Sequence, residues 1–140
     1  MVMQFRYLAS KGPGGVLVKR PSIPVLFYNG DIDMELTPLL DSGADMSAID
    51  YRLATTLGLD LSGKRIKSYG ISGSVESVIS HVNIRIGRGH ELYSFQIPIR
   101  VLFSGSDYVA PTLLGRKGFF EQFKVCIEES SQKVKLTASE

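Results

Sequence analysis

Apolar and polar residues alternate along most of this chain with a period of two. That period is typical of β-strands that bury one face, and Gly, Pro and Asn residues between the alternating runs favour turns. We therefore expect hairpins across the turns at 10–15, 29–31, 87–90 and 129–133. The predicted strands are 3–9, 15–20, 22–29, 32–40, 63–70, 74–80, 80–87, 91–103 and the two halves of 123–138.

Two segments depart from this alternation and predict short helices. Residues 48–59 contain Asp50 as a candidate N-cap and Gly58 as a stop signal, with apolar residues on one helical face at Leu53, Ala54 and Leu57. The second candidate is 116–123, "RKGFFEQF". The pattern therefore predicts a mainly β chain with one or two short helices.

Composition limits the classes of function. A length of 140 residues suits a single domain, 1–140, and the net charge of +2 gives no strong attraction to nucleic acid or to a membrane surface. No apolar run approaches the roughly 20 residues of a membrane span, and the N-terminus lacks the apolar core of a signal peptide. We expect a cytoplasmic protein.

Cysteine and histidine usage agrees with that expectation. The single Cys126 cannot form an internal disulfide, which fits a reducing compartment. His81 and His90 have no ligand-like spacing with each other or with Cys126, so we expect no metal site.

The segment 36–50, "LTPLLDSGADMSAID", contains a carboxylate in an unusual place. Asp41 follows the apolar pair Leu39–Leu40 directly, and the small residues 42–44 follow it. A carboxylate beside a buried strand needs a partner or a role. A turn closed by the Asp41 side chain is one reading, and a carboxylate presented for chemistry on a rigid loop is the other.

Three motifs occur in a fixed order: "LLDSGAD" at 39–45, "YGISGSV" at 69–75 and "TLLGRKGF" at 112–119. In order and spacing they resemble the retropepsin-like family, the single-domain aspartic proteases, over roughly residues 30–125. The resemblance implies a closed, barrel-like β fold and peptide-bond hydrolysis. The N-terminal hairpin and the last hairpin match no motif of that family.

The resemblance also implies roles for individual residues. Asp41 resembles the catalytic aspartate, and Ser42 and Gly43 complete the Asp-Ser-Gly signature. Ala44 resembles a residue whose backbone contacts substrate. The flap that folds over bound peptide corresponds to Gly70, Ile71, Ser72 and Gly73. An ordinary hairpin turn is the alternative reading of these four residues.

Two further roles follow from the late motif. The segment beneath the active loop corresponds to Leu113, Leu114 and Gly115. Asp45 and Arg116 occupy positions that form an ion pair in retroviral members, although two unrelated surface charges would leave the same pattern. The flap has Ser72 where retroviral members are richer in glycine, and the chain is longer than theirs.

Hydrolysis of an amide by water needs a base for the proton of water and an acid for the carbonyl oxygen. Two carboxylates that share one proton supply both, because at about 3 Å they cannot both ionise. This chain has one Asp-Ser-Gly, so the simplest arrangement is a homodimer in which Asp41 meets Asp41 of a second copy on a two-fold axis.

The sequence thus predicts a homodimeric aspartic endopeptidase that acts on peptide or protein substrates. Its nucleophile is water, and it needs neither a metal nor an organic cofactor. Two alternatives stay open at this stage: a catalytically silent peptide-binding module of the same fold, and an interaction domain in which the motif is accidental.

Overall fold

The structure is a computed structural model that describes residues 1–70 and 73–139. These residues form three β-sheets. One α-helix, α1 (Tyr51–Thr56), and one 3₁₀ turn, η1 (Pro13–Gly15), lie between strands of this described part. The strands are β1 (Val2–Arg6), β2 (Leu8–Lys11), β3 (Leu17–Arg20), β4 (Val25–Asn29), β5 (Ile32–Leu36), β6 (Leu39–Leu40), β7 (Ser47–Asp50), β8 (Ile66–Gly70), β9 (Gly73–Arg88), β10 (Glu91–Leu102), β11 (Leu113–Leu114), β12 (Phe123–Glu128) and β13 (Lys133–Ala138).

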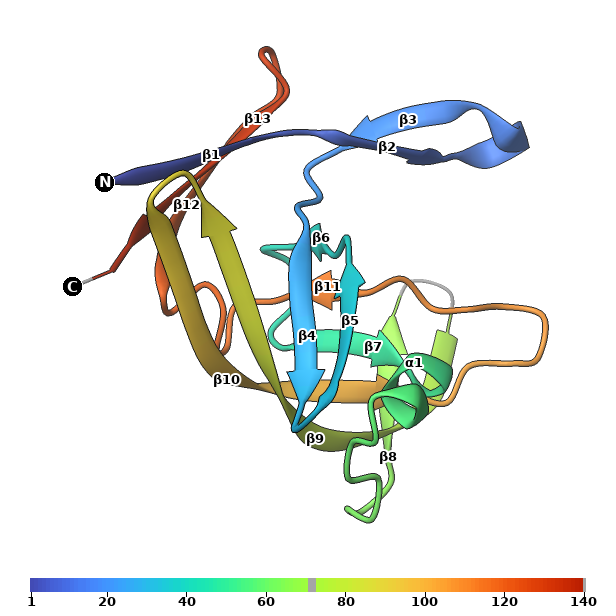
Figure 1. The fold of residues 1–140 in the computed structure, drawn as a ribbon. Helices are drawn as coiled ribbons and strands as arrows, with labels where there is room; N and C mark the ends of the chain where they lie inside the picture. The colour runs from blue at the N-terminus through green and yellow to red at the C-terminus, as the bar shows by residue number, and fades with distance from the viewer. Residues whose placement is uncertain (71–72, 140) are drawn as a thin grey trace.

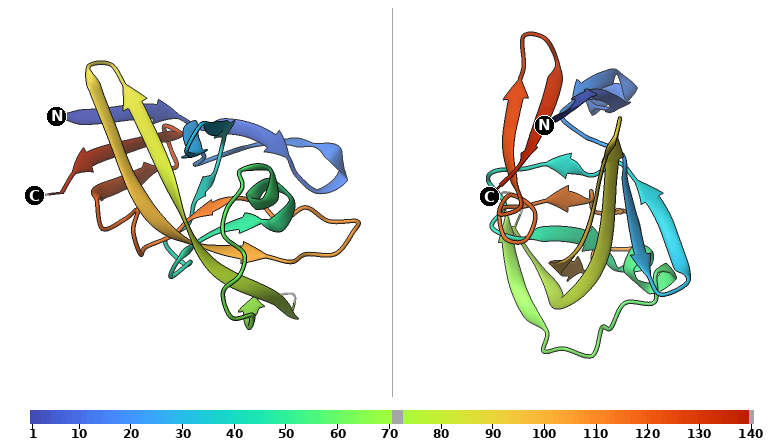
Figure 2. Two further views of the ribbon diagram at one scale, coloured as in Figure 1. Left: turned by 60° about the horizontal axis from the view of Figure 1, so that its bottom comes forward. Right: turned by 60° about the vertical axis from the view of Figure 1, so that its left-hand side comes forward.

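The largest sheet has the strand order β5-β4-β9-β10-β7-β11-β6, with β8 paired to β9. It curls into a half-barrel around the core, and the β1-β13-β12 sheet lies at one end of it (Figures 1 and 2). The expected mainly β, barrel-like fold is confirmed.

The β9–β10 hairpin is the longest element and shows why the alternation was informative. Its register runs from the pair Arg88–Glu91 to the pair Ser77–Leu102. Apolar side chains on the inward face of both strands are fully buried: Val78, Val82, Ile84, Ile86, Ile97, Ile99 and Val101. The strands predicted at 74–80 and 80–87 are one continuous strand, β9.

The N-terminal segment divides in two, which the alternation did not predict. β2 pairs with β3 in the expected hairpin, but β1 leaves it and pairs with β13 from the other end of the chain. Burial explains the choice, because Met3 and Phe5 of β1 pack in the core with Val134 and Leu136 of β13. The β2–β3 hairpin extends away from the main sheet (Figure 1).

The two helix predictions have different outcomes. α1 forms as expected, with the Asp50 side chain accepting a hydrogen bond from Arg52 N, and Gly58 follows it at φ +69°. Residues 116 and 118–122 form turns and Lys117 forms a single bridge with Met46, so the second prediction is wrong. Gly118 has φ +89°, which ends any helix there, and the turns place Phe119 and Phe123 in the core.

Within the described ranges, none of the helices has the length and apolar character needed to cross a membrane.

Candidate active site

Asp41 lies at the end of β6, where neighbouring strands hold its backbone. β6 pairs in parallel with β11, Leu39 opposite Leu113 and Leu40 opposite Leu114. The Asp41 N–H continues this ladder by donating to Leu114 O at 3.0 Å. Leu40 and Leu114 are buried, so apolar packing beneath the carboxylate fixes its position in the fold.

The residues after Asp41 turn tightly around its side chain. Gly43 N donates to Asp41 Oδ1 at 2.9 Å, and Ala44 N donates to Asp41 O at 3.2 Å. A Cβ at position 43 would lie 3.1 Å from Oδ1, so a larger residue there would crowd the carboxylate. Ser42 is exposed and Asp41 is half-buried. The turn closed by the side chain therefore exists, and it leaves the carboxylate partly open to solvent.

The segment after β11 packs directly against this loop. Arg116 N donates to Ala44 O and Lys117 N to Asp45 O, both at 2.9 Å. Gly115 N donates to the buried Ser47 Oγ at 3.0 Å. A Cβ on Gly115 would lie 2.5 Å from the Met46 carbonyl carbon, which no real structure tolerates without movement. Close contact between the two backbones is therefore the physical reason for glycine at position 115.

The structure does not bring the side chains of Asp45 and Arg116 into an ion pair within the described residues. Arg116 is exposed and joins the loop through its backbone. The carboxylate of Asp45 lies instead 4.0 Å from Arg100 Nη2, and this carboxylate is 78% exposed. The partner differs because β10, which carries Arg100, pairs with β7 immediately after the loop.

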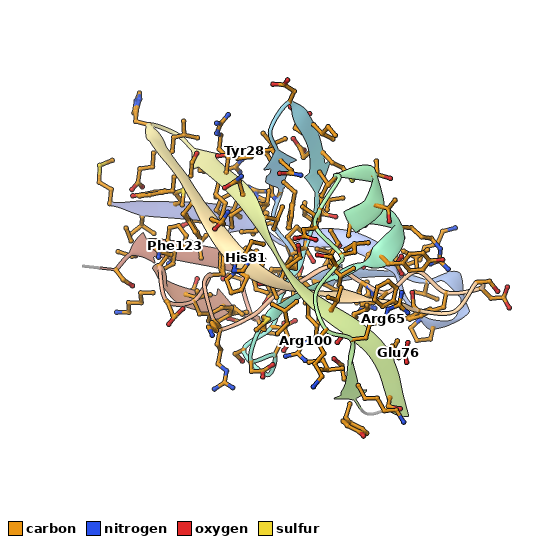
Figure 3. All side chains as sticks on the ribbon, turned by 90° about the horizontal axis from the view of Figure 1, so that it is seen from below. Tyr28, Arg65, Glu76, His81, Arg100 and Phe123 are labelled. Carbon is orange, nitrogen blue, oxygen red and sulfur yellow. The ribbon has the colours of Figure 1, made fainter. Side chains whose placement is uncertain are left out.

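Arg100 also reaches β8. Its Nη1 donates to Ser68 Oγ at 3.0 Å, and Ser68 Oγ lies 2.6 Å from Ser77 Oγ on β9. Arg100 thus connects the loop after Asp41 with the β8–β9 pair, and Figure 3 shows it near the end of the molecule that β8 occupies. Arg100 could not be singled out in the sequence, because one charged residue on the outward face of a strand is ordinary.

β8 and the start of β9 form an antiparallel pair in register from Ile66–Ser77 to Gly70–Gly73. Of the four residues assigned to a flap, Gly70 and Gly73 end the two strands, while Ile71 and Ser72 lie outside the described residues. Tyr69, which precedes Gly70 on β8, is 81% exposed.

A second aspartate, Asp50, ends β7 in a different environment. It is fully buried, and its carboxylate accepts hydrogen bonds from Arg52 N, Arg52 Nη1, Ser104 Oγ and Ala110 N. Burial by itself would raise the pKa of Asp50, but the hydrogen bonds from Ser104, Arg52 and Ala110, together with the Arg52 charge, lower it below the usual value.

Asp50 and Arg52 together anchor the loop between β10 and β11. Arg52 Nη1 donates to Tyr108 O at 3.0 Å and its Nη2 to Gly105 O, while Asp50 binds the same loop at Ser104 and Ala110. This loop leads into β11 beneath Asp41. The N-cap signal at Asp50 was visible in the sequence, whereas its partners some 54 and 60 positions away were not.

Metal ligation finds no support in the described residues, because no group of three or more His, Cys, Asp or Glu side chains there could hold an ion.

Comparisons with known proteins agree with this geometry. The aspartyl protease family model matches residues 25–115, which include β4 to β11 and the loop at Asp41. No curated protein matches the chain significantly.

Two solved structures are similar. A retropepsin-like aspartic protease from Rickettsia conorii is 19% identical, with a TM-score of 0.57 over 97% of this chain and 91% of that one. EIAV protease, solved in complex with an inhibitor, is 25% identical, with a TM-score of 0.45 over 70% of this chain and 83% of that one. On the family match, the chain belongs to the aspartyl protease family, and its fold is that of a retropepsin-like aspartic protease.

Proposed function

We propose that this protein is a single-domain aspartic endopeptidase that is active as a homodimer. The observation that carries the proposal is the carboxylate of Asp41, held rigidly at the end of β6 yet half-exposed, with one local hydrogen bond from Gly43 N to Oδ1. A structural carboxylate in a chain of this family would be expected to have its oxygens satisfied by the fold.

The mechanism needs Asp41 from both copies. The ionised carboxylate takes a proton from a water molecule, and the oxygen of that water attacks the carbonyl carbon of the peptide. The protonated carboxylate gives its proton to the carbonyl oxygen, forming a neutral tetrahedral diol. Collapse of the diol breaks the C–N bond and returns a proton to the departing amine. No metal or organic cofactor takes part in these steps.

The small residues of the loop suit such an assembly. Ser42 and Gly43 are exposed, and Gly43 leaves the space beside Oδ1 free of a side chain. Two copies can therefore approach at this loop without displacing bulky groups. The β8–β9 pair is assigned as the flap, whose strands would supply backbone partners to an extended peptide and exclude water.

Concentration dependence tests the proposal. Hydrolysis of fluorogenic peptides should rise faster than linearly with protein concentration until the dimer saturates, while sedimentation shows the shift from monomer to dimer. The Asp41→Asn protein, purified in the same way, controls for contaminating proteases. Full activity in a species of monomer mass would rule out a shared dyad.

The pH profile gives a second readout. The rate should follow a bell, because the pair is active only when it holds one proton. A monotonic profile at constant dimer content would contradict the mechanism. Peptide binding without hydrolysis would support the silent binding module instead.

A further inference from the structure

A groove of about 450 Å³ lies between the β2–β3 hairpin and the loop that leads into β11. All four residues of β2 line it on one side and the consecutive residues 109–112 on the other. Side chains in a strand point alternately to opposite faces, so a wall made of four consecutive residues exposes the edge of the strand. The other edge of β2 is paired to β3, which leaves this edge free of a strand partner within the described residues.

The groove adjoins the loop of Asp41. Leu39, which lines it, precedes Asp41 by two residues, and its N–H donates to Thr112 O on the opposite wall at 2.9 Å. Two residues of extended chain span at most about 7 Å. A peptide whose scissile bond lies at Asp41 would therefore enter this groove within about four residues of that bond.

The charged side chains in the described lining of the groove are all positive. Lys11 and Arg20 are the charged residues of its described lining, and no acid accompanies them. Arg20 has no ion pair among the described residues, and its Nε, although buried, has no hydrogen-bond partner there. The Arg20 side chain as a whole is half-buried, and a carboxylate is the group that the fork geometry of its guanidinium fits best.

We infer that this groove is a specificity site of the protease, in which a substrate segment extends along the free edge of β2 and places an acidic side chain against Arg20 and Lys11. The extended backbone would add to β2 as a further strand. Apolar side chains of the substrate next to the acidic one would pack against the leucines of the groove, which are Leu8, Leu36, Leu39 and Leu53. The inference rests on the proposed function for the location of the scissile bond, but the binding preference itself does not depend on cleavage.

Positional libraries of octapeptides test it, with Glu or Gln fixed at one position and the others randomised. The wild-type protein should cleave one Glu-fixed library, with Glu within four residues of the cleaved bond, about tenfold faster than its Gln counterpart, a difference typical of one charge-assisted hydrogen bond. This preference should weaken as NaCl rises, because an exposed charge such as Lys11 is screened.

Variants separate the site from the rest of the protein. Arg20→Met should bring the Glu/Gln ratio close to one. Lys11→Met should reduce the ratio several-fold, and it decides the question if Arg20→Met fails to fold, because Lys11 is exposed. Arg85→Met, on the outward face of β9, is the matched control and should keep the full ratio.

Retention of labelled libraries on immobilised Asp41→Asn protein separates this inference from the proposed function. Retention of Glu-fixed over Gln-fixed peptides that depends on Arg20 supports the groove even if the wild-type protein cleaves nothing. Equal rates of cleavage on the Glu-fixed and Gln-fixed libraries at every position would overturn the specificity site and leave the proposed protease function intact. A Glu preference that survives in both Arg20→Met and Lys11→Met also overturns it.

Discussion

Asp41 and Asp50 lie nine positions apart at the two ends of one segment, and the fold treats their carboxylates in opposite ways. Asp50 is fully buried and accepts hydrogen bonds from four donor atoms, including Nη1 of a charged guanidinium. Asp41 is half-buried, and among the described residues its side chain accepts one hydrogen bond, from Gly43 N of its own turn.

The difference is the one expected between a structural carboxylate and the catalytic carboxylate that we propose. A carboxylate whose oxygens are all occupied by fixed donors stabilises the folded state but has no lone pair left for water or substrate. A carboxylate held by its backbone and left open at its side chain can exchange a proton. Position in the sequence does not distinguish the two, because both aspartates end short strands.

The largest effect expected from this comparison is on activity. Under the proposed mechanism, Asp41→Asn removes from both copies the base that activates water, so peptide hydrolysis should fall by about a thousandfold or more. The melting temperature should stay close to that of the wild type, since the single hydrogen bond from Gly43 can be kept by an amide oxygen. Hydrolysis assays and thermal melts on the same preparations check both. An Asp41→Asn protein that cleaves as fast as wild type would end the aspartic protease assignment of this site.

Asp50→Asn should show the reverse, a loss of stability. It leaves the Arg52 guanidinium without its charge partner and one of the donors without an acceptor, which should cost about 3 kcal/mol. Chemical denaturation measures it. Asp50 and Arg52 anchor the loop from β10 to β11. Activity should therefore fall only in proportion to the loss of folded protein and to any displacement of this loop.

The pH dependence of this loss has a defined sign. The pKa of Asp50 is lowered in the folded state, so its contribution to stability is fully present above the usual Asp value of about 4 and is lost as pH falls through the lowered pKa. The stability gap between wild type and Asp50→Asn should therefore be widest at neutral pH and narrow in acid. A gap of constant size from pH 7 to pH 2 would contradict this.

Gly115→Ala should displace the backbone of the loop that follows Asp41. The new Cβ would lie within 2.6 Å of the Met46 carbonyl group, so the loop must shift, at a cost of about 1–3 kcal/mol and with a lower kcat. Gly105→Ala is the matched control, because a Cβ there meets nothing within 4 Å. Equal activity and stability of the two variants would mean that the close approach is unimportant.

The smallest effects concern the charges around the loop. Arg100→Met removes the bond to Ser68 and the contact with Asp45, and it should cost about 1 kcal/mol and raise KM. Arg116→Ala should change stability by less than about 1 kcal/mol, because that side chain is exposed. Denaturation curves and steady-state kinetics rank the two. A larger loss for Arg116→Ala would restore the pairing of Asp45 with Arg116 that the resemblance implies.

Local signals were sufficient for part of this protein. The period-two alternation identified β9 and β10, the Asp50 and Gly58 signals identified α1, and the Asp-Ser-Gly motif after two leucines identified Asp41 as a chemical candidate. Each of these depends on residues a few positions apart, so a pattern in the chain carries the information.

Only the tertiary structure decided which distant segments meet. β1 pairs with β13 and not with its neighbour, Asp45 faces Arg100, and Asp50 holds a loop more than fifty residues away. The groove with Arg20 joins an N-terminal hairpin to residues 109–112 in the same way. Such contacts result from the burial of the whole core at once, and packing of that kind leaves no periodic trace in the sequence.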